Sequence, residues 1–246
     1  MTGTITLVMP AFRPPPVFPD VIKGITSLDG DHLIQSIIIV DDGSEATYAD
    51  VFAAAARFPR ISVVRRDVNG GQGAALKTGI AYALKHAPDL AGVITADADG
   101  QHAPRDVVSI AHAFAAQPDA VILGVRAFGR DVPLRSRIGN VLTKRLVAWL
   151  GGLTVADTQT GLRGWPRHAC ERNLRNPATG FEFNLSTLLA AAAAGDTIIE
   201  RPIQTIYEPG NPSSHFRPLQ DSIRIYRVLV RHAFRRLFGV SSRRAE

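Results

Sequence analysis

The sequence has little cysteine and no internal repetition. Cys170 is the one cysteine among 246 residues, so the chain forms no internal disulfide and suits a reducing cytosol. No histidine and acid motif accompanies Cys170, which we therefore expect to be a small buried side chain and not a nucleophile. The chain also has no low-complexity run and no repeat of fixed period. A disulfide scaffold and a repeat protein are therefore excluded.

Long apolar runs are absent as well. No window of about 18 uninterrupted apolar residues occurs, so we expect no single helix to span a bilayer. Residues 1–12, MTGTITLVMPAF, have no basic leader before an apolar block and do not resemble a signal peptide. The chain has no nucleic-acid-binding motif and no aromatic platform, so a nucleic acid is not the expected partner.

The composition fits one compact domain with an anionic partner. Hydrophobic residues make up 46% of the chain, enough to bury a substantial core. The net charge is +6 and the pI is about 10, which suits a nucleotide, a lipid phosphate or a membrane surface. Much of the basic charge lies in residues 126–145 and in the tail after Arg224.

Strand-like and helix-like segments alternate over the first 125 residues. Apolar runs predict strands at 4–9, 36–41, 60–66, 92–96 and 120–125, and helical spacing predicts helices at 18–28, 47–58, 70–87 and 105–117. This alternation predicts a mostly parallel sheet with helices on both faces. Beyond it we expect a basic helix at 136–150, a loop at 154–166, a helix at 183–194, a strand at 197–207 and a final helix at 219–238.

Two pairs of acids stand at the ends of predicted strands. Asp41 and Asp42 follow one apolar strand, and Asp97 and Asp99 follow another. Ligands of such sheets gather at the carboxyl ends of the strands, so we expect these acids around one crevice. Carboxylates suit Mg²⁺ or Mn²⁺, which are commonly shared with a substrate pyrophosphate. Each pair taken alone also fits a solvated acidic turn, and both interpretations stay open.

A glycine-rich segment, NGGQGAALKTG at 69–79, opens one of the predicted helices. Glycines allow a backbone to approach a ligand closely, and a helix N-terminus favours anions. The spacing is not that of a Walker loop, and the segment does not follow the first strand as a dinucleotide fingerprint would. It therefore predicts an anion-binding helix entrance of another kind.

Six segments in this order resemble glycosyltransferase family 2: VMPAF, IIIVDDGS, NGGQGAALKTG, TADADGQH, GVR and DTQTGLRGWP. Within that family the chain is similar to the dolichyl-phosphate mannose synthase and polyprenyl-phosphate glycosyltransferase branch, over roughly residues 4–215. The resemblance implies a Rossmann-like GT-A fold for residues 1–217, with a basic amphipathic helix and tail at 218–246. It also implies a metal-dependent, inverting hexosyltransferase.

The resemblance assigns roles to individual positions. It implies that a nucleotide-diphosphate sugar is held by Pro10, Ala11, Asp41, Asp42, Gly71, Lys77, Asp97 and Ala98. It implies that Mg²⁺ or Mn²⁺ is bound by Asp97, Asp99 and Gln101. Catalytic roles fall on Asp99, Arg126 and Asp157, the last on the acceptor side. The acceptor phosphate is expected near Arg126, Arg135, Arg137, Ser214 and His215, although His215 also fits a loop residue in solvent.

The chain departs from the family at two places. The family often has PAYNE after the first strand, whereas this chain has PAFRPPP, so an acid near the nucleoside is missing and Arg13 stands close by. The glycine-rich segment often has lysine where this chain has Gln72. These departures bear on the identity and affinity of the nucleotide.

The acceptor divides the possible functions. A polyprenyl phosphate is already ionised near pH 7, so Asp157 would then orient the acceptor; a hydroxyl of a glycan or lipid would need Asp157 as a base. The nearby arginines favour the phosphate. A third possibility, of another class, is a silent protein that binds a nucleotide sugar or a membrane partner without turnover.

The final helix bears on location. Its apolar residues recur at spacings of three and four among arginines, which is typical of a helix lying on a membrane surface, and also of a helix docked on its own domain with a solvated basic face. We expect a cytoplasmic protein, peripheral at the inner face of the cell membrane. Many relatives carry transmembrane helices here, so a separate membrane-protein partner is a further expectation.

Overall fold

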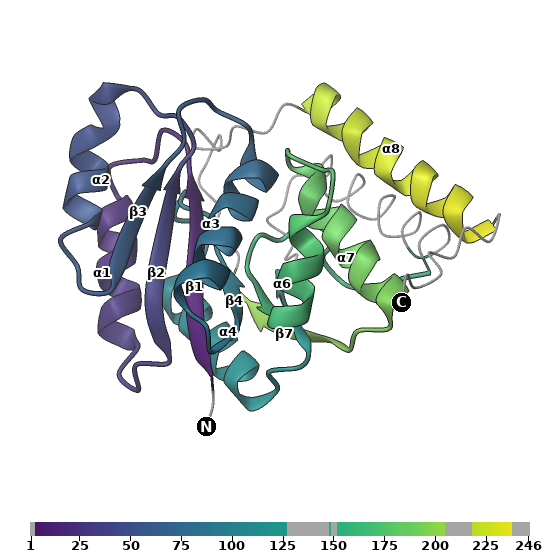
Figure 1. Ribbon diagram of the computed structural model, residues 1–246, viewed down its shortest axis with the longest axis horizontal. Coiled ribbons are helices and arrows are strands. Elements are labelled where there is room, and N and C mark those ends of the chain that lie inside the picture. Colours follow the sequence, from purple (N-terminus) through teal and green to yellow (C-terminus); the bar gives the residue numbers. More distant parts are fainter. Residues whose placement is uncertain (1–2, 127–147, 149–151, 205–217, 238–246) are drawn as a thin grey trace.

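The sequence folds into a seven-stranded sheet flanked by helices (Figure 1). The computed structural model describes residues 3–126, 148, 152–204 and 218–237. Its strands are β1 (Thr4–Ala11), β2 (Ile34–Asp41), β3 (Ile61–Arg65), β4 (Leu90–Thr95), β5 (Val121–Arg126), β6 (Arg163–Pro166) and β7 (Ile198–Ile203). Its helices are α1 (Phe18–Leu28), α2 (Ala49–Ala55), α3 (Gln72–His86), α4 (Pro104–Ala116), α6 (Arg167–Leu174), α7 (Glu182–Ala194) and α8 (Pro218–Leu237), with a 3₁₀ turn, η1, at Ala46–Tyr48.

The strand order is β3-β2-β1-β4-β6-β5-β7. The pairs β1–β2, β1–β4, β2–β3 and β5–β7 are parallel, which confirms the predicted mostly parallel sheet. The prediction of a loop throughout 154–166 was wrong at its end, because Arg163–Pro166 forms β6, antiparallel to both β4 and β5. A strand of four residues shows too little alternation to be recognised, and its two neighbours supply its hydrogen bonds.

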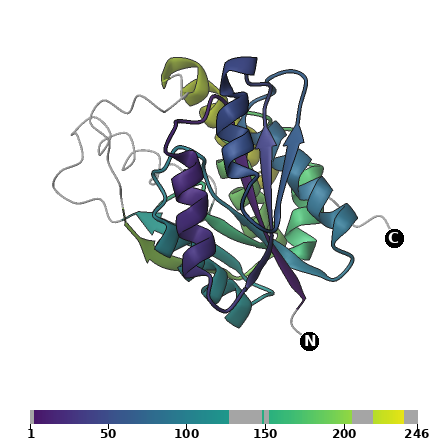
Figure 2. The ribbon, with the colours of Figure 1, turned by 90° about the vertical axis from the view of Figure 1, so that its left-hand side faces the viewer.

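Alternate side chains of the central strands supply two cores. On β2, Ile37 and Ile39 pack with α1, α2 and α4, whereas Ile38 and Val40 pack on the opposite face with α3, α6 and α7. This is the reason for the unbroken β-branched run: a parallel strand covered on both faces needs apolar residues at every position. Figure 2 shows the sheet edge-on between α1 and α3.

The final helix, α8, packs on α7 and leaves a second apolar stripe exposed. Ile225 and Leu229 are buried in a third cluster with Leu185, Leu188 and Leu189 of α7. Another side of α8 exposes Ile223, Tyr226, Val230 and Phe234, each between 38% and 59% accessible. Helix α8 is therefore docked on the domain, which is one of the two interpretations of its sequence. It also exposes an apolar stripe, which the other interpretation, a helix lying on a membrane surface, requires. None of the described helices is both long and apolar enough to cross a membrane.

Two further helical features differ from the sequence-based expectation. The segment 47–58 forms only η1 and the short α2, and Arg167–Leu174 forms α6, which had not been predicted. The basic helix expected at 136–150 lies outside the described residues, Ala148 apart. The division into a domain of 1–217 and a tail of 218–246 stays a prediction.

Candidate active site

A cavity of about 500 Å³ lies at the carboxyl ends of β1, β2 and β4. Four segments supply much of its wall, one at the end of each of these strands and one at the start of α3, and the loop before α7 and one residue of α8 supply the rest. The lining residues are Pro10, Ala11, Phe12, Arg13, Pro14, Pro15, Asp42, Asn69, Gly70, Gly71, Gln72, Ala75, Asp97, Ala98, Asp99, Thr179, Gly180, Phe181 and Arg224. A crevice is therefore present where the sequence predicted one, but only Asp42 of the first acid pair lines it, together with Asp97 and Asp99.

At one end of the cavity, Asp42 is tied to the entrance of α3. Its carboxylate accepts hydrogen bonds from Gly71 N at 2.8 Å, from Gly70 N at 3.1 Å and from Arg66 Nη1 at 2.5 Å. Burial raises the pKa of Asp42, and the two backbone donors and Arg66 oppose that rise. The bonds fix the glycine-rich loop against β2, so the helix entrance faces the cavity.

Gly71 occupies a position that no other residue fits without strain. Its φ is 90°, a left-handed conformation that L side chains rarely adopt. A Cβ here would meet the Thr179 carbonyl oxygen at 2.8 Å. The backbone at Gly71 therefore lies directly against the loop before α7. Glu182 holds this loop by accepting hydrogen bonds from Thr179 N and Gly180 N.

Asp97 and Asp99 lie on the wall of the cavity just beyond β4. Burial and the charge of Asp97 raise the pKa of Asp99 to about 6. Burial also opposes ionisation of Asp97, but hydrogen bonds with His102 and Gln72 hold its pKa below the usual range. Two carboxylates in one partly buried site repel each other, and a cation between them would offset that repulsion.

The donor set fits a divalent cation that completes its shell with substrate oxygens. Among the residues that the structure describes, no group of three or more His, Cys, Asp and Glu side chains could hold a metal. Mg²⁺ and Mn²⁺ are commonly bound by one or two carboxylates together with substrate phosphates. Asp97 and Asp99 are the residues that would hold such an ion. Gln101, also expected to bind it, donates its backbone N–H to Asp99 Oδ1 at 3.0 Å, and its role stays a prediction.

Asp157 is a buried partner of Arg126 and does not line the cavity. It is 0% exposed, and its Oδ2 accepts a hydrogen bond from Arg126 Nε at 2.6 Å. Its Oδ1 accepts from the backbone N–H groups of Gln159 and Thr160. Burial opposes ionisation, but the contact with Arg126 holds the pKa of Asp157 below its usual range. Such a carboxylate orients an arginine better than it takes up a proton.

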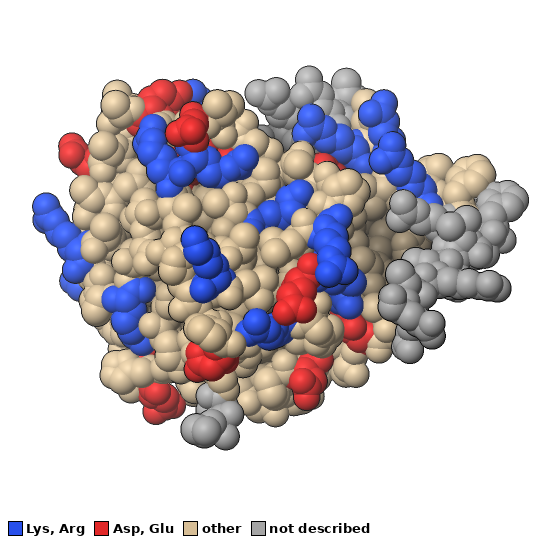
Figure 3. Space-filling view, viewed as in Figure 1, with Lys and Arg blue, Asp and Glu red and all other residues tan. Residues whose placement is uncertain are grey.

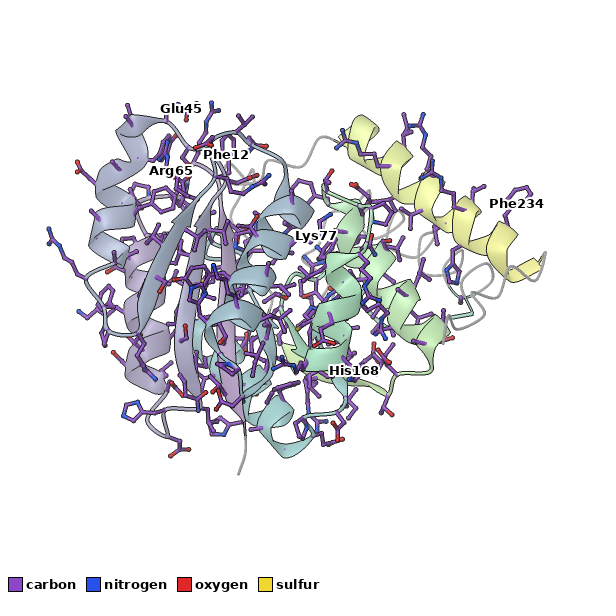
Figure 4. All side chains as sticks on the ribbon, in the orientation of Figure 1. Phe12, Glu45, Arg65, Lys77, His168 and Phe234 are labelled. Atoms are coloured by element: carbon purple, nitrogen blue, oxygen red, sulfur yellow. The ribbon has the colours of Figure 1, made fainter. Side chains whose placement is uncertain are left out.

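Two residues expected to bind the nucleotide point elsewhere. Asp41 accepts hydrogen bonds from Ser44 N at 2.8 Å and Arg65 Nη1 at 2.7 Å, and thus shapes the loop after β2. Lys77 donates to the Asn176 carbonyl at 2.9 Å, on the side of α3 away from Phe12 and Glu45 in Figure 4. Neither lines the cavity. The expected acceptor residues Arg135, Arg137, Ser214 and His215 lie outside the described residues.

Some residues of the site gave no signal in the sequence. Arg224 reaches the cavity from α8, more than 40 residues after the loop that it joins there. Arg13 was noted in the sequence as standing close to the nucleoside, but its contacts were not: it pairs with Glu45, and its guanidinium lies 4.8 Å from the centre of the Phe12 ring. A sequence gives the order of such residues but not the contacts between loops, so only the fold brings them together.

A mostly parallel sheet with an acid-lined cavity at the carboxyl ends of its strands defines a class: α/β proteins that bind a ligand in the crevice at that edge of the sheet. Within that class the chain belongs to glycosyl transferase family 2, whose sequence profile matches residues 6–171. It is a glycosyltransferase, and the fold is GT-A, as the sequence predicted.

Among three relatives in sequence, two have names of the expected branch. The chain is 31% identical to protein MJ1222 of Methanocaldococcus jannaschii over 82% of each chain. It is 28% identical to the UDP-N-acetylglucosamine-dolichyl-phosphate N-acetylglucosaminyltransferase of Methanococcus voltae, over 82% of this chain and 86% of that one. A polyprenol monophosphomannose synthase of Mycolicibacterium smegmatis is 27% identical over 68% of this chain and 65% of its own length. The predicted resemblance to polyprenyl-phosphate glycosyltransferases is confirmed.

Solved structures of glucosyl-3-phosphoglycerate synthase from Mycobacterium tuberculosis are similar to this chain. The complex of that enzyme with Mn²⁺, UDP and glucosyl-3-phosphoglycerate has a TM-score of 0.69 at 19% identity, covering 94% of this chain and 80% of that one. Its complex with Mg²⁺ and UDP has a TM-score of 0.70, with the same coverage. At this identity the likeness establishes the fold.

Proposed function

We propose that this glycosyltransferase moves a hexose from a nucleotide-diphosphate sugar to a polyprenyl phosphate at a membrane surface, with Mg²⁺ or Mn²⁺ as cofactor. The burial and hydrogen bonding of Asp157 are the observations that favour a phosphate over a hydroxyl as the acceptor. A hydroxyl acceptor needs a base, but Asp157 is fully buried, bonded to Arg126 and held below its usual pKa. A phosphate acceptor is ionised near pH 7 and needs an oriented cation, which Arg126 supplies.

Different parts of the cavity suit different parts of the sugar donor. The nucleoside would lie toward Asp42 and the entrance of α3, and the diphosphate would lie against Asp97 and Asp99. A bound divalent cation would offset the charge that develops on the departing diphosphate. Arg126 interacts electrostatically with both Asp97 and Asp99, so an acceptor phosphate held by Arg126 would lie near the transferred sugar. The relatives of the dolichyl-phosphate and polyprenol classes support the same assignment.

The chemistry of the product tests the acceptor class. With a nucleotide-diphosphate sugar and a polyprenyl phosphate, we expect a lipid-linked product that releases its sugar under mild acid, because a glycosyl phosphodiester has a good leaving group. UDP-sugars and GDP-sugars are compared in parallel, with and without Mn²⁺. A product stable to mild acid would instead indicate a glycoside formed on a hydroxyl, and would contradict the proposed acceptor.

We also propose that α8 places the protein on the anionic inner face of the cell membrane. Its exposed stripe of Ile223, Tyr226 and Val230 is flanked by Arg227 and Arg231, both exposed. Apolar residues beside arginines suit the boundary between acyl chains and anionic headgroups. Figure 3 shows basic side chains along α8, and Figure 4 shows Phe234 on the same helix. A separate membrane-protein partner stays a prediction.

Removing the stripe is expected to weaken membrane binding. For the double variant Ile223→Ser, Val230→Ser we expect at least about tenfold weaker binding to vesicles containing anionic lipid, because two partly exposed apolar side chains lose their contact with lipid. Co-sedimentation with vesicles measures this. Leu28→Ser is the matched control, since Leu28 is 54% exposed on α1. Equal binding of the double variant and the wild type would show that the exposed stripe of α8 does not bind the membrane.

A further inference from the structure

Gln72 stands between the cavity acids and α7. Its side-chain Nε2 donates a hydrogen bond to Asp97 Oδ1 at 2.6 Å, and its Oε1 accepts one from Asn184 Nδ2 at 3.2 Å. The two ends of an amide have opposite roles, so the donor on Asn184 fixes which end of Gln72 faces Asp97. Asn184 is itself 5% exposed on α7, which leaves it little freedom to move.

Asp97 is held from its other side as well. Its Oδ2 lies 3.2 Å from His102 Nε2, and His102 is 5% exposed. The carboxylate also packs closely on Gly161, where a Cβ would clash with Asp97 Oδ2. Asp97 is therefore bracketed by Gln72, His102 and Gly161. Its neighbour Asp99 accepts from the backbone of Gln101, within the turn that follows β4.

We propose that Gln72 is a positioning residue for the divalent cation, held in place by Asn184. A neutral amide orients the Asp97 carboxylate without itself offsetting the negative charge that would attract the cation. Groups that orient a ligating carboxylate contribute to metal affinity as well as to geometry. This inference rests on the proposed metal-dependent donor binding. It adds two residues that would hold the metal-binding carboxylate in place, Gln72 on α3 and Asn184 on α7.

The proposal makes a prediction about metal affinity that needs no turnover. Mn²⁺ is titrated into the protein with UDP, and separately with GDP, while electron paramagnetic resonance measures free Mn²⁺. Gln72→Ala removes the orienting donor, and Gln72→Lys replaces it with a cation that offsets the charge of Asp97. We expect each to raise the Kd for Mn²⁺ by about 10- to 100-fold. Asn184→Ala is expected to act in the same direction, because it releases the amide of Gln72.

Controls separate positioning from a general loss of structure. Gln117→Lys adds the same charge at an exposed site at the end of α4, and its Kd for Mn²⁺ is expected to stay within about twofold of the wild type, because a distant surface charge is screened. Thermal unfolding without metal is expected to change little in Gln72→Lys, by about 2 °C or less, because Gln72 lies at the cavity wall.

Each outcome decides one claim. Unchanged Mn²⁺ affinity in both Gln72 variants, with folding intact, would overturn the positioning role, and so would a wild type that binds no Mn²⁺ with either nucleotide. A wild type that binds Mn²⁺ more tightly than the Gln72 variants, but transfers no sugar to polyprenyl phosphate, would support the role of Gln72 and contradict the proposed acceptor. The two failures are thus distinguishable.

Discussion

Replacing Asp99 with asparagine is expected to lower the rate of sugar transfer by at least about 10²- to 10³-fold, because the site loses half of the carboxylate pair that would hold the cation. The loss should appear in initial rates measured at saturating donor and Mn²⁺. It should not be restored by more Mn²⁺. Transfer within about tenfold of the wild type would contradict a role for Asp99 at the metal.

The same variant should not be less stable without metal. Asp99 ionises in the unfolded chain at a pKa of about 4, but burial and the charge of Asp97 raise its pKa in the folded protein to about 6. The folded state therefore loses stability as the pH rises from about 4 to 6, and the whole penalty, about 1–3 kcal/mol, is present above pH 6. Asparagine removes it, so at pH 7.5 the midpoint of thermal unfolding is expected to be equal to that of the wild type or higher. A clear fall would show that the activity loss reflects unfolding.

Replacing Arg163 with methionine is expected to cost about 3–5 kcal/mol of unfolding free energy. Arg163 is 1% exposed and donates to three backbone carbonyls, at 2.8 Å to Thr160, 3.0 Å to Thr158 and 2.5 Å to Asn184. Burial lowers its pKa to about 10, so it stays charged at neutral pH. Methionine fills much of the space but leaves the three carbonyls without that donor.

Urea-induced unfolding followed by circular dichroism measures this cost. Arg105→Met is the matched control, because Arg105 is exposed on α4 and its loss is expected to change the unfolding free energy by less than about 0.5 kcal/mol. Because Arg163 ties the loop that carries Asp157 to α7, transfer activity should fall together with stability. A loss below about 1 kcal/mol in Arg163→Met would contradict the structural role of the three hydrogen bonds.

The sequence predicted the parts of this fold that depend on local pattern. The unbroken run at β2 indicated a strand covered on both faces, and Ile37 and Ile38 do pack on opposite sides of the sheet. Asp42 follows β2 directly and Asp99 lies in the turn just after β4, so the topology brought them to one cavity. The final helix was predicted from spacing at 219–238 and observed at Pro218–Leu237.

The sequence could not predict which way individual side chains point, nor which distant segments of the chain come into contact. The family resemblance implied that Lys77 binds the nucleotide, but Lys77 lies five residues after Gln72, about 140° further around the helix. Gln72 therefore faces the cavity, whereas Lys77 faces Asn176. Asp157 was considered as a base, but only the fold brings Arg126 onto it. The short strand β6 depends on its two neighbours in the same way.

The most direct test of the proposed function compares two acceptors that differ in one group. Transfer from the preferred nucleotide-diphosphate sugar is measured with a polyprenyl phosphate and with the polyprenol of the same length, in the presence of Mn²⁺. The proposed acceptor class predicts transfer to the phosphate, its loss on chelation of the metal, and no transfer to the alcohol, because Asp157 is bonded to Arg126 and is proposed to orient that arginine instead of acting as a base. Equal or faster transfer to the polyprenol would contradict it.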